Sequence, residues 1–99
     1  MDLQQITEGL RERVGEDSGL GARVKFDFSD DGVVLVDATQ VPNAVSNEDG
    51  EADCTLKLSL ADFAALVNGE LDAATAFMMG KLKVEGDMGI AMRLQGVLG

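Results

Sequence analysis

The spacing of the apolar residues changes along the chain, and this change restricts the fold more than any other feature. In residues 23–28, Val24, Phe26 and Phe28 alternate with polar residues, which is typical of a strand with one buried face. Residues 33–36 are apolar on both faces, so we expect this strand to be central in its sheet. Strands are predicted at residues 23–28, 33–36, 40–46, 54–58 and 81–85.

Elsewhere the apolar residues recur at helical spacing, with polar residues on the opposite side. Ser59 and Asp87 each precede such a segment and are predicted N-caps. The order of elements predicts one α+β domain over residues 1–99, in which helices cover one face of a five-stranded, largely antiparallel sheet. Helices are predicted at residues 2–14, 60–67, 72–79 and 88–98.

The composition excludes several kinds of catalytic and metal site. The chain has no His, Trp or Tyr, and its one cysteine is Cys54. Without His there is no Ser-His-Asp triad, Cys-His pair or His metal site, and one Cys forms neither an intrachain disulfide nor a Cys-based zinc site. Cys54 alternates with Leu56 and Leu58, so we expect a buried, unreactive thiol. We therefore predict no catalytic residue, no metal and no cofactor.

The charge and the terminal sequences restrict partners and location. Eighteen acidic residues stand against eight basic ones, giving a formal net charge of −10. Such a charge repels nucleic acids and anionic membranes, so we expect no nucleic-acid partner and at most transient membrane contact. No apolar run approaches the ~20 residues of a membrane helix, and residues 1–6 do not resemble a signal peptide. The expectation is a cytoplasmic protein.

Residues 27–32 resemble the first half of a calcium-binding loop, but a hairpin turn explains them better. Asp27, Ser29 and Asp31 occupy the first, third and fifth positions of such a loop. The twelfth position is Ala38, where calcium requires a bidentate Glu. Both flanking segments also have strand spacing, and an Asp-Gly pair favours a hairpin.

The predicted helix 88–98 is apolar around most of its circumference, although covering a sheet needs only one apolar stripe. Its second apolar neighbour is a partner subunit, the preceding helices or a bound lipid, and the residues alone leave this open. Four methionines, at 78, 79, 88 and 92, suit either an ordinary core or a cavity that accepts varied apolar shapes.

Residues 52–95 also contain a long pattern of defined sequence. It includes DCT at 53–55, the helix end LVNG at 66–69 and the continuous run GKLKVEGDMGIAMRL at 80–94. This pattern resembles the sterol carrier protein 2 family. The resemblance implies a stand-alone domain whose sheet and helices enclose an apolar tunnel. It also implies a non-enzymatic carrier of fatty acids, fatty acyl-CoA, sterols or isoprenoid-type lipids.

The resemblance and the apolar pattern together suggest which side chains meet the lipid. We expect ten apolar residues to line the tunnel and Gln95 to offer a polar contact near its mouth. The alternative function is an interaction or accessory module, such as a lipid-handling factor of quinone biosynthesis, that docks on a protein partner or a second copy through helix 88–98. The apolar candidates are Phe63, Leu66, Phe77, Met78, Leu82, Val84, Met88, Ile90, Ala91 and Leu94.

Overall fold

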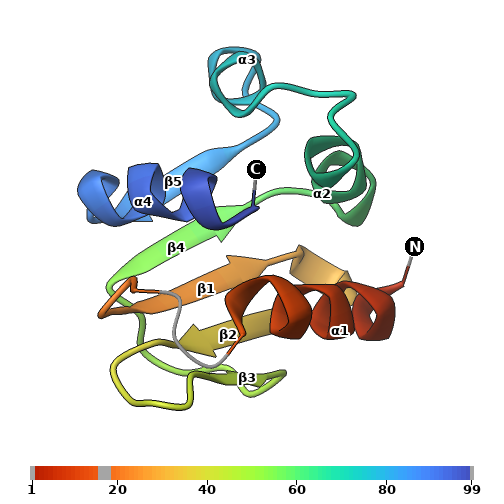
Figure 1. The fold of residues 1–99 in the computed structure, drawn as a ribbon. Coiled ribbons are helices and arrows are strands. Elements are labelled where there is room, and N and C mark those ends of the chain that lie inside the picture. Colours follow the sequence, from red (N-terminus) through yellow and green to blue (C-terminus); the bar gives the residue numbers. More distant parts are fainter. Residues whose placement is uncertain (1, 16–18, 99) are drawn as a thin grey trace.

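The computed structural model describes residues 2–15 and 19–98, with side chains as far as Leu94, and its centre is a sheet of five strands (Figure 1). The strands lie in the order β3-β2-β1-β4-β5. All neighbours are antiparallel except β1 and β4, which are parallel, so the prediction of a largely antiparallel sheet is confirmed. The strands are β1 (Arg23–Asp27), β2 (Val33–Asp37), β3 (Ala44–Ser46), β4 (Cys54–Lys57) and β5 (Lys83–Gly86).

The helices lie mainly over one face of this sheet. α1 packs against β2 and β3, whereas α4 packs against β4, β5 and α1. α2 and α3 lie in the connection between β4 and β5, and Figure 1 shows α3 at the opposite end of the molecule from β3. The expected α+β class is therefore confirmed. The helices are α1 (Leu3–Val14), α2 (Leu60–Val67), α3 (Ala73–Met78) and α4 (Met88–Leu98).

The strand register brings apolar side chains into rows on the covered face. Phe26 on β1 pairs with Val34 on β2 and with Leu56 on β4, and Leu56 pairs with Val84 on β5. Val34, Phe26 and Leu56 are buried, and Val84 is half-buried. The alternation seen in the sequence therefore continues as one apolar row across four strands.

Two predicted strands are shorter than the sequence pattern suggested. β5 begins at Lys83 instead of Lys81, because the backbone N–H groups of Lys81 and Leu82 both donate to Ala76 O at the end of α3, at 2.9 and 3.2 Å. The edge strand β3 begins at Ala44 instead of residue 40, since Pro42 has no N–H to offer a ladder. The other elements begin and end within two residues of the prediction.

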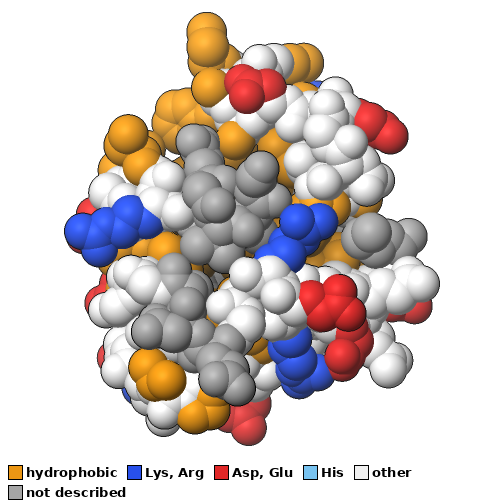
Figure 2. Space-filling model, in the orientation of Figure 1, with side chains coloured by type: hydrophobic (Ala, Val, Ile, Leu, Met, Phe, Trp, Pro, Cys, Tyr) orange, Lys and Arg blue, Asp and Glu red, His pale blue; other side chains and the backbone are white. Residues whose placement is uncertain are grey.

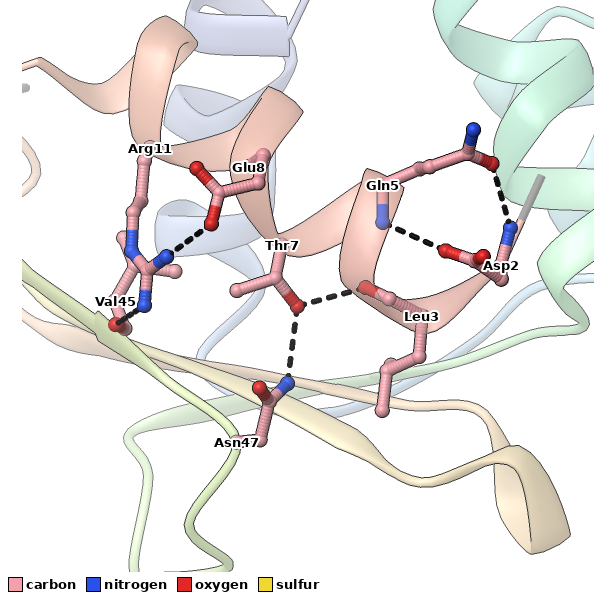
Figure 3. A network of polar contacts seen from close by, with 8 residues as sticks. All are labelled: Asp2, Leu3, Gln5, Thr7, Glu8, Arg11, Val45 and Asn47. Atoms are coloured by element: carbon pink, nitrogen blue, oxygen red, sulfur yellow. Dashed lines mark hydrogen bonds and ion pairs between the residues drawn. The ribbon is translucent and has the colours of Figure 1, made fainter.

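Side-chain caps fix where the helices begin. Ser59 accepts from the backbone N–H of Asp62 at 3.0 Å, and Asp87 accepts from that of Gly89 at 2.8 Å. Both predicted N-caps are thus confirmed. Asp2 forms a full capping box with Gln5, which the sequence analysis did not identify (Figure 3). These bonds satisfy N–H groups that the first helical turn leaves without partners.

A small polar network attaches α1 to the far edge of the sheet (Figure 3). Asn47, just beyond β3, donates through Nδ2 to Thr7 Oγ1 at 3.0 Å and to Val33 O at 3.1 Å. Arg11 donates to Val45 O at 3.1 Å and pairs with Glu8. The network lies at the β2–β3 side of the sheet, away from β4 and β5.

The segment compared with a calcium loop is a hairpin connection, as predicted. Residues Ser29–Asp31 form a short 3₁₀ helix between β1 and β2, and Phe28 N donates to Gly32 O at 2.9 Å. In the part of the chain that the structure describes, no helix has the length and apolar character to span a bilayer.

Candidate functional site

An apolar cavity of about 270 Å³ lies between the β4–β5 half of the sheet and helices α2, α3 and α4. The sheet contributes side chains from β1, β4 and β5, and the three helices form the remaining walls. All fifteen lining residues are apolar. They are Phe26, Leu56, Leu58, Phe63, Leu66, Ala73, Ala74, Phe77, Met78, Leu82, Val84, Met88, Ala91, Met92 and Leu94.

The inner end of the cavity is closed by packed aromatic and aliphatic side chains. Phe26, Phe63 and Leu94 are each 3% exposed or less. The ring of Phe63 meets Phe26 edge to face, with centroids 5.5 Å apart and planes at 80°. This arrangement suits the ring quadrupoles and gives the cavity a rigid inner wall.

The outer end of the cavity is open and surrounded by exposed apolar side chains. Met78 is 85% exposed and Met92 is 71% exposed, while Phe77 and Met88 are each 49% exposed. In Figure 2, hydrophobic side chains gather on the surface over α3 and the start of α4. We call Phe77, Met78, Met88 and Met92 the lip. The expected tunnel is thus a cavity with a wide apolar mouth.

The chemistry available in the cavity is limited to apolar contact. None of the described lining side chains is polar, so none donates a hydrogen bond, a proton or a nucleophile to a ligand inside. Cys54 is fully buried and lies outside the lining set. Burial, and to a smaller extent the charge of Asp87, raises the pKa of its thiol, which disfavours the reactive thiolate.

Nine of the eleven predicted site residues lie around this one cavity. Ile90 is not among the residues that line it. Its side chain is buried against the core beside a separate polar hollow that Asp53 and Arg93 help to form. The side chain of Gln95 lies outside the described residues.

The sequence analysis missed six lining residues, and most of them carried a usable signal. Phe26, Leu56 and Leu58 were predicted to point inward, but the alternation does not distinguish a cavity wall from a packed core. Met92 follows Met88 by one helical turn and so shares its side of α4. Ala73 and Ala74 gave no signal, since their contribution is the room that a small side chain leaves.

Together, the α+β sheet with its helical layer and the open apolar cavity define a small domain suited to binding an apolar ligand. The chain belongs to the SCP-2 sterol transfer family, whose model matches residues 3–99. The resemblance noted in residues 52–95 therefore extends over almost the whole chain.

Individual relatives agree with this assignment. Sterol carrier protein 2 of Homo sapiens is 44% identical over 55 residues, which cover 56% of this chain and 10% of the human protein. The apo form of Sterol Carrier Protein 2 from Yarrowia lipolytica has a TM-score of 0.76 and 26% identity, covering 94% of this chain and 86% of that one. Palmitated SCP2L2 from Aedes aegypti has a TM-score of 0.68 and 25% identity, covering 99% of this chain and 95% of that one.

Proposed function

We propose that this protein is a non-enzymatic carrier that holds one lipid molecule in the cavity and releases it unchanged. The observation that supports this most strongly is the combination of a wholly apolar lining with a mouth formed by the exposed lip. None of the described lining side chains is polar, so a ligand enters past apolar groups and meets no described group that could alter it chemically.

The free energy available from burial is sufficient for useful affinity. Each buried methylene contributes about 0.8 kcal/mol, so an acyl chain with about ten buried methylenes gains about 8 kcal/mol. This gain alone corresponds to a dissociation constant of about 1 μM. The cost of immobilising the chain is subtracted from it, so we expect dissociation constants above about 1 μM for ten buried methylenes. An empty apolar cavity of this size would also leave its walls without van der Waals partners, which favours occupancy.

Among lipid classes, we propose fatty acids and fatty acyl-CoA first, with sterols and isoprenoid-type lipids as alternatives. The similarity to palmitated SCP2L2 of Aedes aegypti supports a straight acyl chain. Native mass spectrometry of freshly purified protein, followed by lipid extraction, tests the proposal. A stoichiometric adduct of lipid mass supports it. A bare 10.4 kDa ion that also fails to bind added palmitate contradicts it.

The exposed lip also supports the second candidate, an interaction module that docks through α4. Substituting Met88 by Lys separates the two functions, because Met88 lines the cavity and is 49% exposed. Met79→Lys is the matched control, since Met79 is 60% exposed but lies outside the cavity wall.

For a carrier, Met88→Lys should lower lipid retention at least tenfold and leave the protein in its original oligomeric state, whereas Met79→Lys should change neither. For a docking module, Met88→Lys should abolish binding to the partner or the second copy, as measured by size-exclusion chromatography with light scattering. Equal lipid retention by wild type and Met88→Lys would contradict the carrier proposal.

A further inference from the structure

Resting on the proposed carrier function, we propose that Phe63 is the specificity-determining residue that limits how long an acyl chain the cavity accepts. Its ring forms part of the inner wall of the cavity. The same ring also packs on Phe28, which is 2% exposed and is not among the lining residues.

The geometry around Phe63 is that of a wedge between the cavity and the core. Its ring meets Phe26 edge to face at 5.5 Å and Phe28 edge to face at 5.7 Å, with interplanar angles of 80° and 81°. Phe26 and Phe28 themselves stack nearly parallel, at 6.5 Å and 12°. The Phe63 ring, from α2, is therefore perpendicular to the rings of both Phe26 and Phe28. Removing the Phe63 ring would move the inner wall of the cavity back toward Phe28.

The position of Phe63 is fixed by its helix. Ser59 caps the start of α2, and the N–H of Phe63 donates to Ser59 O at 3.0 Å. The ring is 3% exposed and packs edge to face on both Phe26 and Phe28, and these contacts resist its rotation away from an incoming chain. A chain that reaches Phe63 therefore stops there.

The direction of entry follows from the lining. A carboxylate or other polar head would find no hydrogen-bond partner among the described lining side chains, so burying it carries a large desolvation cost. The head remains at the lip in water, and the methyl end of the chain enters first. The inner wall then meets the terminal methyl group, and the distance from lip to Phe63 sets the preferred chain length.

Competition among saturated fatty acids tests this inference directly. The protein is incubated with an equimolar mixture of even-numbered acids from C8 to C20, and native mass spectrometry records the share of each in the complex. For wild type we expect a maximum at one chain length. For Phe63→Ala we expect that maximum to move to chains longer by about two to four methylenes, because the wall recedes by most of a side chain.

Two further variants keep the test decisive. Phe63→Leu removes less volume and keeps the core apolar, so it should move the maximum in the same direction even where Phe63→Ala does not fold. Phe77→Ala is the same substitution at the lip, where the side chain lines the cavity but is 49% exposed. It should lower retention of all chain lengths by a similar factor and leave the maximum unchanged, because Met78, Met88 and Met92 still form the lip and Phe63 still forms the inner wall.

The outcomes separate this inference from the function on which it rests. A wild-type protein that retains no fatty acid of any length overturns the proposed function. A wild-type protein with a clear maximum that Phe63→Leu and Phe63→Ala leave in place overturns the inference alone. A purely structural loss would lower retention at all lengths together, so a change in the rank order of chain lengths supports the assignment to Phe63.

Discussion

Gly86 lies so close to Asp53 that a side chain at this position would collide with the backbone. A Cβ built on Gly86 would be 2.3 Å from Asp53 O, and Gly86 also has a φ of +95°. Here β5 ends opposite Cys54 of β4, and Asp87 N donates to the same Asp53 oxygen at 3.0 Å. The contact sets the point from which α4 starts back over the cavity.

We therefore expect Gly86→Ala to lower the free energy of unfolding by about 2–4 kcal/mol. An alanine is strained at this positive φ, and its Cβ would push the backbone away from β4. Urea denaturation followed by circular dichroism measures the change. Gly9→Ala is the matched control, because Gly9 lies within α1 and a Cβ there meets nothing within 4 Å. It should stabilise the protein by about 0.5–1 kcal/mol. Equal effects of the two substitutions would contradict the role assigned to Gly86.

The attachment of α1 to the sheet gives a second prediction. Asn47→Ala should destabilise the fold by about 1–2 kcal/mol, because it removes the amide that bonds the buried Thr7 hydroxyl (Figure 3). The same amide also bonds Val33 O, which would lose this partner. Combining it with Thr7→Val in a double-mutant cycle isolates the Asn47–Thr7 bond. A coupling energy of zero would show that this bond does not hold α1 in place.

The sequence predicted the elements well because strand and helix spacing depend on which side of each segment is buried. The strand 23–28 and the helix 60–67 each contain a clear apolar face, so their positions followed from local pattern. The start of β5 could not be predicted from local pattern, since it depends on hydrogen bonds from Lys81 and Leu82 to Ala76 in the preceding helix. The parallel pairing of β1 with β4 likewise joins segments about thirty residues apart and has no local signal.

The candidate site was predicted for a different reason. Helix 88–98 is apolar around most of its circumference, which indicated a second apolar neighbour besides the sheet. The structure places the cavity beside this helix. The pattern did not separate Ile90, which faces the core, from Met92, which faces the cavity, because both are apolar residues on one short helix. That distinction depends on how α4 is rotated on the sheet, which tertiary packing determines.

Asp37 should make part of the stability dependent on pH. The Thr39 hydroxyl first, and the Thr39 backbone N–H second, lower the pKa of the Asp37 carboxyl below its ordinary value of 3.8. Burial opposes them, and Arg23 lowers the pKa by smaller effects. The hydrogen bond from Thr39 N to Oδ1 is 3.0 Å, and Arg23 Nε lies 3.3 Å from Oδ2. The folded state thus binds a proton less readily than the unfolded state.

The stabilisation from this carboxylate is fully present above the unfolded pKa and is lost as the pH falls through the lower folded pKa. Asp37→Asn should therefore be less stable than wild type at pH 7, and the difference should shrink below about pH 4. Thermal unfolding from pH 2.5 to 7 measures this. Asp30→Asn is the control, because the Asp30 carboxylate makes no hydrogen bond or ion pair with the residues that the structure describes. A constant difference between Asp37→Asn and wild type over the whole range would contradict the prediction.

Filling the cavity should stabilise the fold, since a ligand that binds only the folded state shifts the unfolding equilibrium. At a free concentration 100 times the dissociation constant the gain is about 2.7 kcal/mol. For a domain of this size each kcal/mol raises the melting temperature by about 4–8 °C, so palmitate kept below its micelle concentration should raise it by about 10–20 °C. Acetate carries the same head group without a chain and should produce no shift, because the fifteen lining side chains are apolar and offer a carboxylate no hydrogen bond. Equal melting temperatures with palmitate and acetate, measured by calorimetry, would show that the cavity does not hold an acyl chain.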